Sequence, residues 1–90
     1  MKADRTKTLR LLKTARGQLD GIIKMVEDDR YCIDISNQLM ATQSLIGRIN
    51  TDVLAAHIEG CVRQALASGT EQEKNDKLGE IESILAKLTR

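Results

Sequence analysis

One uninterrupted helical pattern spans the middle of this 90-residue chain and constrains its fold more than any other feature. From about Cys32 to Ala67 there is no proline, and seam residues keep a helical period over about nine or ten turns. The seam positions are Ile35, Leu39, Thr42, Ile46, Ile49, Val53, Leu54, Ile58, Val62 and Ala65 or Leu66. The pattern predicts a single long helix over residues 32–67.

Two shorter helices are predicted on either side of it. The first covers about residues 4–28, and its apolar seam consists of Leu9, Leu12, Leu19, Ile22, Ile23 and Val26. The second covers about residues 71–89, after a stop at Ser68, Gly69 and Thr70. Its apolar side consists of Leu78, Ile81, Ile84, Leu85 and Leu88. The sequence therefore predicts an all-α fold of three helices in one domain over residues 1–90.

A helix of this length needs more cover than two short helices supply. The only aromatic residue is Tyr31, so no large ring can anchor a monomeric core. An antiparallel dimer, in which the first two helices of each chain form a four-helix bundle, buries the long seam economically. We therefore expect a homodimer, and such dimers can assemble into a larger oligomer.

Positive charge is concentrated at the start of the chain, although the net charge is only +1. Residues 1–16 hold six basic side chains against Asp4 alone, a balance of +5. On a helical wheel an arc of about 80° holds four of them, with Arg10 beside it. These four are Lys2, Arg5, Lys13 and Arg16. Such a stripe is either an ordinary solvated helix face or a surface for DNA phosphates.

Several classes of protein are excluded by what the sequence lacks. No run approaches the roughly 20 apolar residues of a membrane span. The stretch after Met1 has no apolar signal segment, so we expect a cytoplasmic protein whose two cysteines are thiols. There is no phosphate-binding glycine loop and no carboxylate pair placed for acid–base chemistry. We expect no enzyme activity.

Cys32, His57 and Cys61 are the candidate ligands of a metal site. His57 and Cys61 are four residues apart and share a helix face. Cys32 precedes His57 by 25 residues, about 37 Å along a straight helix. In an antiparallel dimer whose long helices cross near residue 45 or 46, Cys32 of one protomer is level with His57 and Cys61 of the other. Two thiolates and one imidazole suit Cu(I), so the spacing predicts two equivalent copper sites per dimer.

Other interpretations of the same residues stay open. The cysteines can be small buried hydrophobes, with His57 a core or surface histidine. Alternatively, Cys32 and Cys61 can form a dithiol switch in which one thiolate attacks a persulfide or oxidant and then links to the other subunit's cysteine. A helical metal-binding or interaction dimer with no DNA role is a third alternative.

Three motifs carry a resemblance that extends from about residue 5 to residue 88. They are Arg16–Ile22, Asp29–Cys32 and His57–Cys61. Together they resemble the CsoR/RcnR family of bacterial repressors. The resemblance implies an all-α dimer that assembles into a tetramer, binds double-stranded operator DNA when apo and releases it when the sensor site is filled. It also implies Cu(I) as the regulatory ligand, because Cys32, His57 and Cys61 match the copper-sensing pattern.

The resemblance further implies roles for residues around that site and on the DNA surface. Arg48 matches a DNA-binding arginine on the long helix. The family's basic position on the first helix falls on Leu11, which Arg10, Lys13 and Arg16 flank. Tyr31 matches a tyrosine next to the ligands, whereas the expected third-helix glutamate aligns with Gly79, with Glu80 adjacent. Part of the first helix, Gly17–Met25, is also similar to the family's persulfide-sensing branch.

Overall fold

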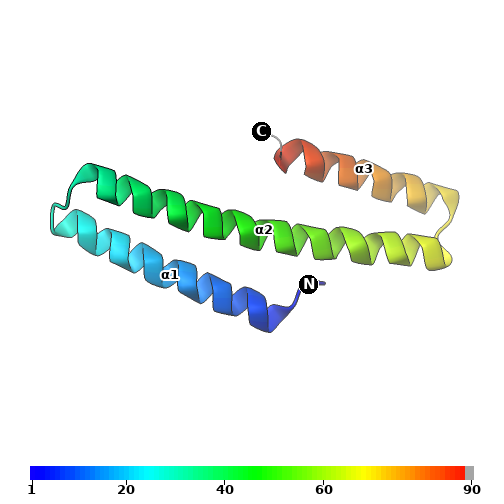
Figure 1. Ribbon diagram of the computed structural model, residues 1–90. Coiled ribbons are helices and arrows are strands. Elements are labelled where there is room, and N and C mark those ends of the chain that lie inside the picture. Colours follow the sequence, from blue (N-terminus) through cyan, green and yellow to red (C-terminus); the bar gives the residue numbers. More distant parts are fainter. Residues whose placement is uncertain (89–90) are drawn as a thin grey trace. The chain divides into compact units, whose positions relative to one another are not determined.

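The computed structural model describes residues 1–88 apart from the side chain of Ser68. These described residues form three helices and no strand. They are α1 (Arg5–Glu27), α2 (Cys32–Ser68) and α3 (Glu71–Leu88) (Figure 1). The all-α prediction is confirmed, and the helix bounds agree to within a residue. The predicted end of the last helix at Thr89 lies outside the described residues. No helix in the described part of the chain has the length and apolar character needed to span a membrane.

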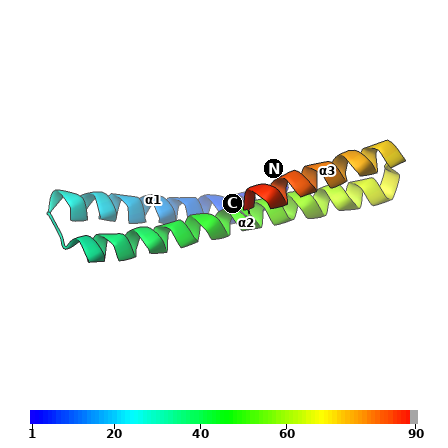
Figure 2. The same cartoon turned by 90° about the horizontal axis from the view of Figure 1, so that it is seen from above.

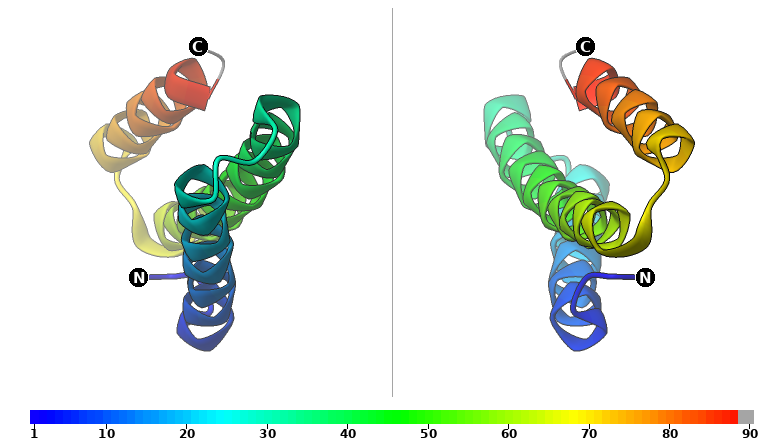
Figure 3. Two further views of the ribbon diagram at one scale, coloured as in Figure 1. Left: turned by 90° about the vertical axis from the view of Figure 1, so that its left-hand side faces the viewer. Right: turned by 90° about the vertical axis from the view of Figure 1, so that its right-hand side faces the viewer.

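Helix α2 takes part in two compact units. The first unit, Asp4–Asp52, is an antiparallel hairpin of α1 and the beginning of α2. The second contains Met1–Ala3 and the described residues from Val53 onward, and in it α3 folds back along the end of α2 (Figure 2). Figure 3 looks onto the α1–α2 turn in its left view and onto the α2–α3 turn in its right view. We call the units the α1–α2 hairpin and the α2–α3 hairpin.

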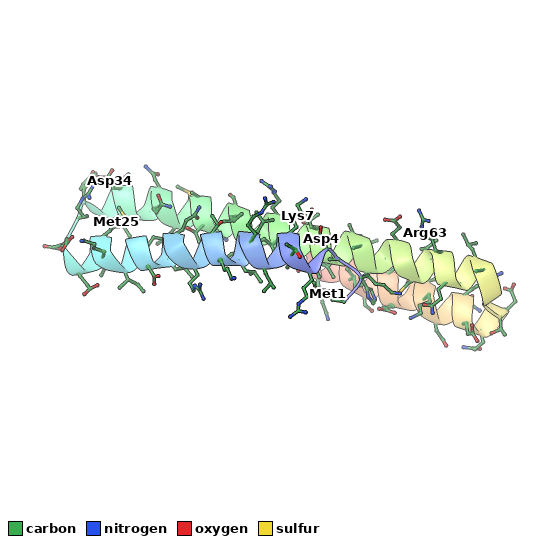
Figure 4. The ribbon with its side chains drawn as sticks, turned by 90° about the horizontal axis from the view of Figure 1, so that it is seen from below. Met1, Asp4, Lys7, Met25, Asp34 and Arg63 are labelled. Atoms are coloured by element: carbon green, nitrogen blue, oxygen red, sulfur yellow. The ribbon has the colours of Figure 1, made fainter. Side chains whose placement is uncertain are left out.

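Side chains and turn residues fix where the helices begin and end. Asp4 caps α1 by accepting a hydrogen bond of 3.1 Å from the backbone N–H of Lys7, one turn further along (Figure 4). Thr70 caps α3 in the same way, through a bond of 3.2 Å from the N–H of Glu73. At the end of α1, Asp29 adopts a left-handed conformation with φ of 52°. It thereby closes a Schellman turn in which the N–H of Arg30 bonds the carbonyl of Met25.

The α1–α2 hairpin has a small aliphatic core with one polar pair inside it. Ala15 and Ile22 of α1 and Ile49 of α2 are buried. Thr42 is only 2% exposed, and its hydroxyl donates a 2.8 Å hydrogen bond to Oε1 of Gln18. Since a buried hydroxyl without a partner is costly, this bond fixes the pairing of the two helices as well as satisfying the hydroxyl.

The seam predicted on the first helix is wrong for a single protomer. Ile22 is buried, but the others are 42–59% exposed, because α1 turns the face one residue away toward α2. That inner face consists of Thr8, Leu11, Ala15, Gln18, Ile22 and Met25. Helix α2 likewise leaves Leu39 and Ile46 exposed by 48% and 46%. We call the uncovered positions the outer seam: Leu9, Leu12, Leu19, Ile23, Val26, Leu39 and Ile46.

Candidate metal centre

Two of the three predicted ligands lie together on α2. His57 and Cys61 are one helical turn apart, and Nε2 of the imidazole lies 3.4 Å from Sγ of the thiol. Cys61 is buried, at 5% exposed, whereas 42% of the His57 side chain is exposed. The pair therefore has one donor atom held inside the α2–α3 hairpin and one at its surface, both turned toward the same point.

Helix α3 brings Glu80 to the same point. Its Oε1 lies 2.6 Å from Nε2 of His57, which is also the nitrogen that faces Cys61. The three ligand atoms all lie within 4.8 Å of one another. Glu80, expected beside the site, thus contacts a predicted ligand directly and is itself a possible ligand.

Lys77 is a member of this cluster that sequence reasoning missed. Its Nζ donates to Oε2 of Glu80 over 3.3 Å. The hydrogen bond to Glu80, followed by the electrostatic influence of the neighbouring Cys61, raises the pKa of Lys77. The pKa of Glu80 is lowered, first by its hydrogen bond to His57 and then by Lys77. The three-residue spacing of Lys77 and Glu80 on one helix face was the available signal.

The cluster borders a pocket between α2 and α3 of about 400 Å³. Its lining residues are Cys61, Gln64, Ala65, Glu73, Asp76 and Lys77. Because Cys61 is only 5% exposed and lines this pocket, the pocket offers a small solute a route to the sulfur.

The remaining predicted residues of the site belong to the α1–α2 hairpin. Cys32 is the first residue of α2, and its thiol is free and exposed. Tyr31 precedes it and is 66% exposed. Neither residue belongs to the ligand group of the α2–α3 hairpin. The roles of Cys32 as a ligand and of Tyr31 beside it stay predictions.

The basic face of α1 is exposed as predicted from its spacing. Arg5, Arg10, Lys13 and Arg16 are exposed, and so is Arg48 of α2. Among the described residues these five form no ion pair, whereas Nζ of Lys7 lies 3.9 Å from Oδ2 of Asp52. The exposed basic groups thus keep their charge available for a partner.

Lys2 lies outside α1, which begins at Arg5. The side-chain carbons of Lys2 instead lie over Gly60, where a Cβ would be only 3.1–3.2 Å from them. Placing Lys2 in the helical arc was therefore wrong. A role of Lys2 in DNA binding stays a prediction.

Comparison with known proteins shows which family this chain matches. Residues 4–87 match the model of a family described as "Metal-sensitive transcriptional repressor". The copper-sensing transcriptional repressor CsoR of Mycobacterium ulcerans is 49% identical over 70 residues, which are 78% of this chain and 60% of that protein. The chain thus spans about 60% of the length of this relative.

Two solved structures have the same fold. The copper-sensing repressor CsoR with Cu(I) from Geobacillus thermodenitrificans NG80-2 is 33% identical, with a TM-score of 0.73 over 90% of this chain and 84% of that one. The nickel-responsive transcriptional regulator InrS has a TM-score of 0.83 over 98% and 96% of the two chains, and its 23% identity shows the fold alone. The matched family is one of transcriptional repressors, in agreement with the expectation of no enzyme activity. With its family model matched over almost its full length, the chain belongs to the metal-sensitive transcriptional repressors.

Proposed function

We propose that this protein is a cytoplasmic repressor that binds operator DNA in its apo state and releases it when Cu(I) binds. The observation that carries the proposal is the 3.4 Å approach of Sγ of Cys61 to Nε2 of His57, together with the free thiol of Cys32. Relatives and a structural neighbour named as copper-sensing repressors support it.

The donor chemistry of the three residues fits Cu(I). A thiolate and an imidazole one turn apart can bind one ion, because neighbouring positions on a helix face bring their donor atoms together. Cu(I) is a soft cation that accepts two sulfurs and one nitrogen without a further ligand. His57 and Cys61 of one protomer with Cys32 of a second would make up this set.

A site shared in this way requires a dimer, and the outer seam supplies a surface for one. Its seven apolar side chains are 42–59% exposed in the α1–α2 hairpin. Burying such a stripe is worth about 25 cal/mol per Å² of apolar surface. Two hairpins that pair through their outer seams form the four-helix bundle, and assembly of two such dimers gives the tetramer.

The basic face of α1 is the proposed contact with operator DNA. Arg5, Arg10, Lys13 and Arg16 supply four unpaired cations per protomer, and Arg48 supplies another from α2. Contacts of this kind neutralise phosphates and make binding strongly dependent on salt. For copper to regulate binding, the ion must favour the DNA-free arrangement of the protomers by several kcal/mol.

A complementation experiment tests the shared copper site. Cys32→Ala and the double variant His57→Ala/Cys61→Ala each lose tight Cu(I) binding, measured anaerobically against a competing chelator. When the two are mixed, unfolded and refolded together, mixed dimers regain one intact site because each protomer contributes what the other lacks. Failure of the mixture to regain tight binding, or unchanged binding by Cys32→Ala, contradicts the proposal.

DNA binding is tested on duplexes selected from a random library by the apo protein. Addition of Cu(I) should release the selected duplex from the wild type but not from Cys32→Ala. Arg16→Ala should lower the slope of log K against log salt by about 0.9 for each phosphate that the variant no longer neutralises. The matched control is Arg63→Ala. The Arg63 side chain projects from α2 near its end (Figure 4), and its guanidinium lies 2.9 Å from Oε1 of Glu59. If no duplex is retained at moderate salt, the chain is an interaction or metal-binding dimer without a DNA role.

Persulfide sensing is the second candidate, and the position of Lys77 beside Cys61 in the lining of the same pocket favours it. The Cys61 thiolate would attack the outer sulfur of a persulfide RSSH and release RS⁻. Cys32 of a second protomer would then attack the resulting Cys61 persulfide, forming a disulfide and releasing HS⁻. Release of the duplex by an organic persulfide and not by Cu(I), with a Cys32–Cys61 cross-link in the intact mass, selects this candidate over copper.

A further inference from the structure

We propose that His57, Cys61 and Glu80 of a single protomer bind a divalent cation of intermediate softness, with zinc as the expected ion. This site needs neither Cys32 nor a second protomer. It shares two ligands with the proposed copper site but does not depend on a copper response. The difference between the two sites is the third ligand, which is a carboxylate of α3 in one and a thiolate from another chain in the other.

The geometry of the three donor atoms supports the site. Atoms bound to one tetrahedral zinc lie about 3.3–3.6 Å apart, as follows from bond lengths of about 2.0–2.3 Å. Sγ of Cys61 and Nε2 of His57 already lie 3.4 Å apart. The 2.6 Å separation of Nε2 and Oε1 of Glu80 must widen by less than about 1 Å, and the separation of Oε1 and Sγ, which is within 4.8 Å, must close to about 3.6 Å. His57 and Glu80 have side chains 42% and 39% exposed, so both have room to make this adjustment.

The surroundings of Glu80 support its role as a ligand through one oxygen. Oε2 accepts a hydrogen bond of 3.3 Å from Lys77, which leaves Oε1 directed at His57. Groups that hold a ligand in this way orient it toward the ion. Cys61 supplies a sulfur ligand from α2, and its burial restricts the movement of that sulfur. The pocket beside it leaves space for a water as fourth ligand.

The donor set also predicts which ions choose this site. A nitrogen, a sulfur and a carboxylate oxygen suit Zn(II), whereas soft Cu(I) prefers sulfur to oxygen. A divalent ion would thus be held within one protomer by Glu80. If the proposed function holds, such an ion leaves Cys32 unbound, does not link two protomers and does not release DNA.

Anaerobic titration of the full-length apo protein with Co(II), a spectroscopic substitute for zinc, tests the site. The wild type and Cys32→Ala should both show the visible bands of a tetrahedral ion and a sulfur-to-cobalt charge-transfer band at one equivalent per protomer. Cys61→Ala should lose the charge-transfer band. Glu80→Gln should bind Co(II) at least tenfold more weakly, whereas Glu82→Gln, an exposed neighbour on α3, should bind like the wild type. Zn(II) should displace Co(II) from every variant that binds it.

Two outcomes overturn the proposal. Equal affinity of Glu80→Gln and the wild type would show that Glu80 is not a ligand, since glutamine keeps helix propensity and circular dichroism checks the fold. Loss of the Co(II) bands in Cys32→Ala would show that the ion uses the shared site instead. Cu(I) binding measured on the same proteins keeps the hypotheses apart, because tight Cu(I) binding by Cys32→Ala would contradict the copper proposal without contradicting this one.

Discussion

The two hairpins share α2, but each is stabilised by a different kind of interaction. The α1–α2 hairpin buries Ile22, Ile49 and Ala15 around a hydrogen-bonded threonine. Among the side chains described from Val53 onward, by contrast, Cys61 alone is buried, and α3 buries none. The α2–α3 hairpin combines half-buried apolar side chains of both helices with the partly exposed cluster of His57, Glu80 and Lys77.

This difference bears on the proposed metal-sensing function. Exposed ion pairs contribute little net stability, typically 0–1 kcal/mol, so the cluster of His57, Glu80 and Lys77 adds little to the stability of the α2–α3 hairpin. A ligand that binds only the folded form stabilises it by mass action, and the proportional effect is largest where stability is lowest. The α1–α2 hairpin, with its buried core, is therefore the scaffold of the protomer, and a metal bound at the proposed site would stabilise the α2–α3 hairpin.

The largest expected effect comes from removing a side chain of the scaffold core. Ile49→Ala should lower the free energy of unfolding by about 2–5 kcal/mol, because it leaves a cavity in a small core. Urea denaturation at fixed protein concentration measures the loss. The matched control is Leu66→Ala in the other hairpin, where the side chain is 75% exposed and the change should stay within about 0.5 kcal/mol. Equal losses would contradict the contrast between the hairpins.

The turn between α2 and α3 offers the next effect. A Cβ added at Gly69 would lie 2.6 Å from the carbonyl oxygen of Ala65, a backbone atom that cannot move away cheaply. Gly69→Ala should therefore destabilise the α2–α3 hairpin by about 1–3 kcal/mol. Gly79→Ala, in open space within α3, should stabilise it by about 1 kcal/mol through helix propensity.

Amide hydrogen exchange of α3 measures both glycine substitutions locally. Protection of α3 should fall in Gly69→Ala and rise in Gly79→Ala, with the α1–α2 hairpin little changed in either. Exchange that changes equally throughout the chain would mean that the two hairpins unfold as one unit.

The polar pair in the scaffold is tested by a double substitution. Thr42→Val keeps the shape of the side chain but leaves Oε1 of Gln18 without its donor, at a cost of roughly 1–2 kcal/mol. Thr42→Val/Gln18→Leu replaces both partners by apolar groups and should recover most of that loss. Urea denaturation measures both. If the double variant is no more stable than Thr42→Val, the hydrogen bond is not what Thr42 contributes.

Sequence reasoning succeeded where local rules decide and failed where packing decides. A proline-free chain with caps at Asp4 and Thr70 specifies where helices begin and end, so their bounds agreed. On α1, two apolar stripes one residue apart are both consistent with the helical period. Only the partner helix decides that Ile22 faces inward while Ile23 stays exposed.

The same distinction applies to the metal centre. His57 and Cys61 were predicted as neighbours because four residues make one helical turn. The approach of Glu80 and Lys77 depends on how α3 packs against α2, which no spacing within one helix encodes. Cys32 is harder still, because its proposed partners lie on a second chain.

The smallest expected effect lies at the α1–α2 turn, where conformation and charge can be separated. Asp29 is held at φ of 52°, a region costly for most side chains and free for glycine. Its charge is unfavourable at the end of α1 and favourable before α2, so the two dipole effects oppose each other. Asp29→Asn removes the charge and keeps a residue that tolerates this conformation, whereas Asp29→Gly removes both the charge and the strain. The stability of Asp29→Gly should therefore exceed that of Asp29→Asn by about 0.5–1 kcal/mol in thermal denaturation. Equal stability of the two variants would mean that the Schellman turn stores no strain, so that the conformation of Asp29 costs the scaffold hairpin no stability.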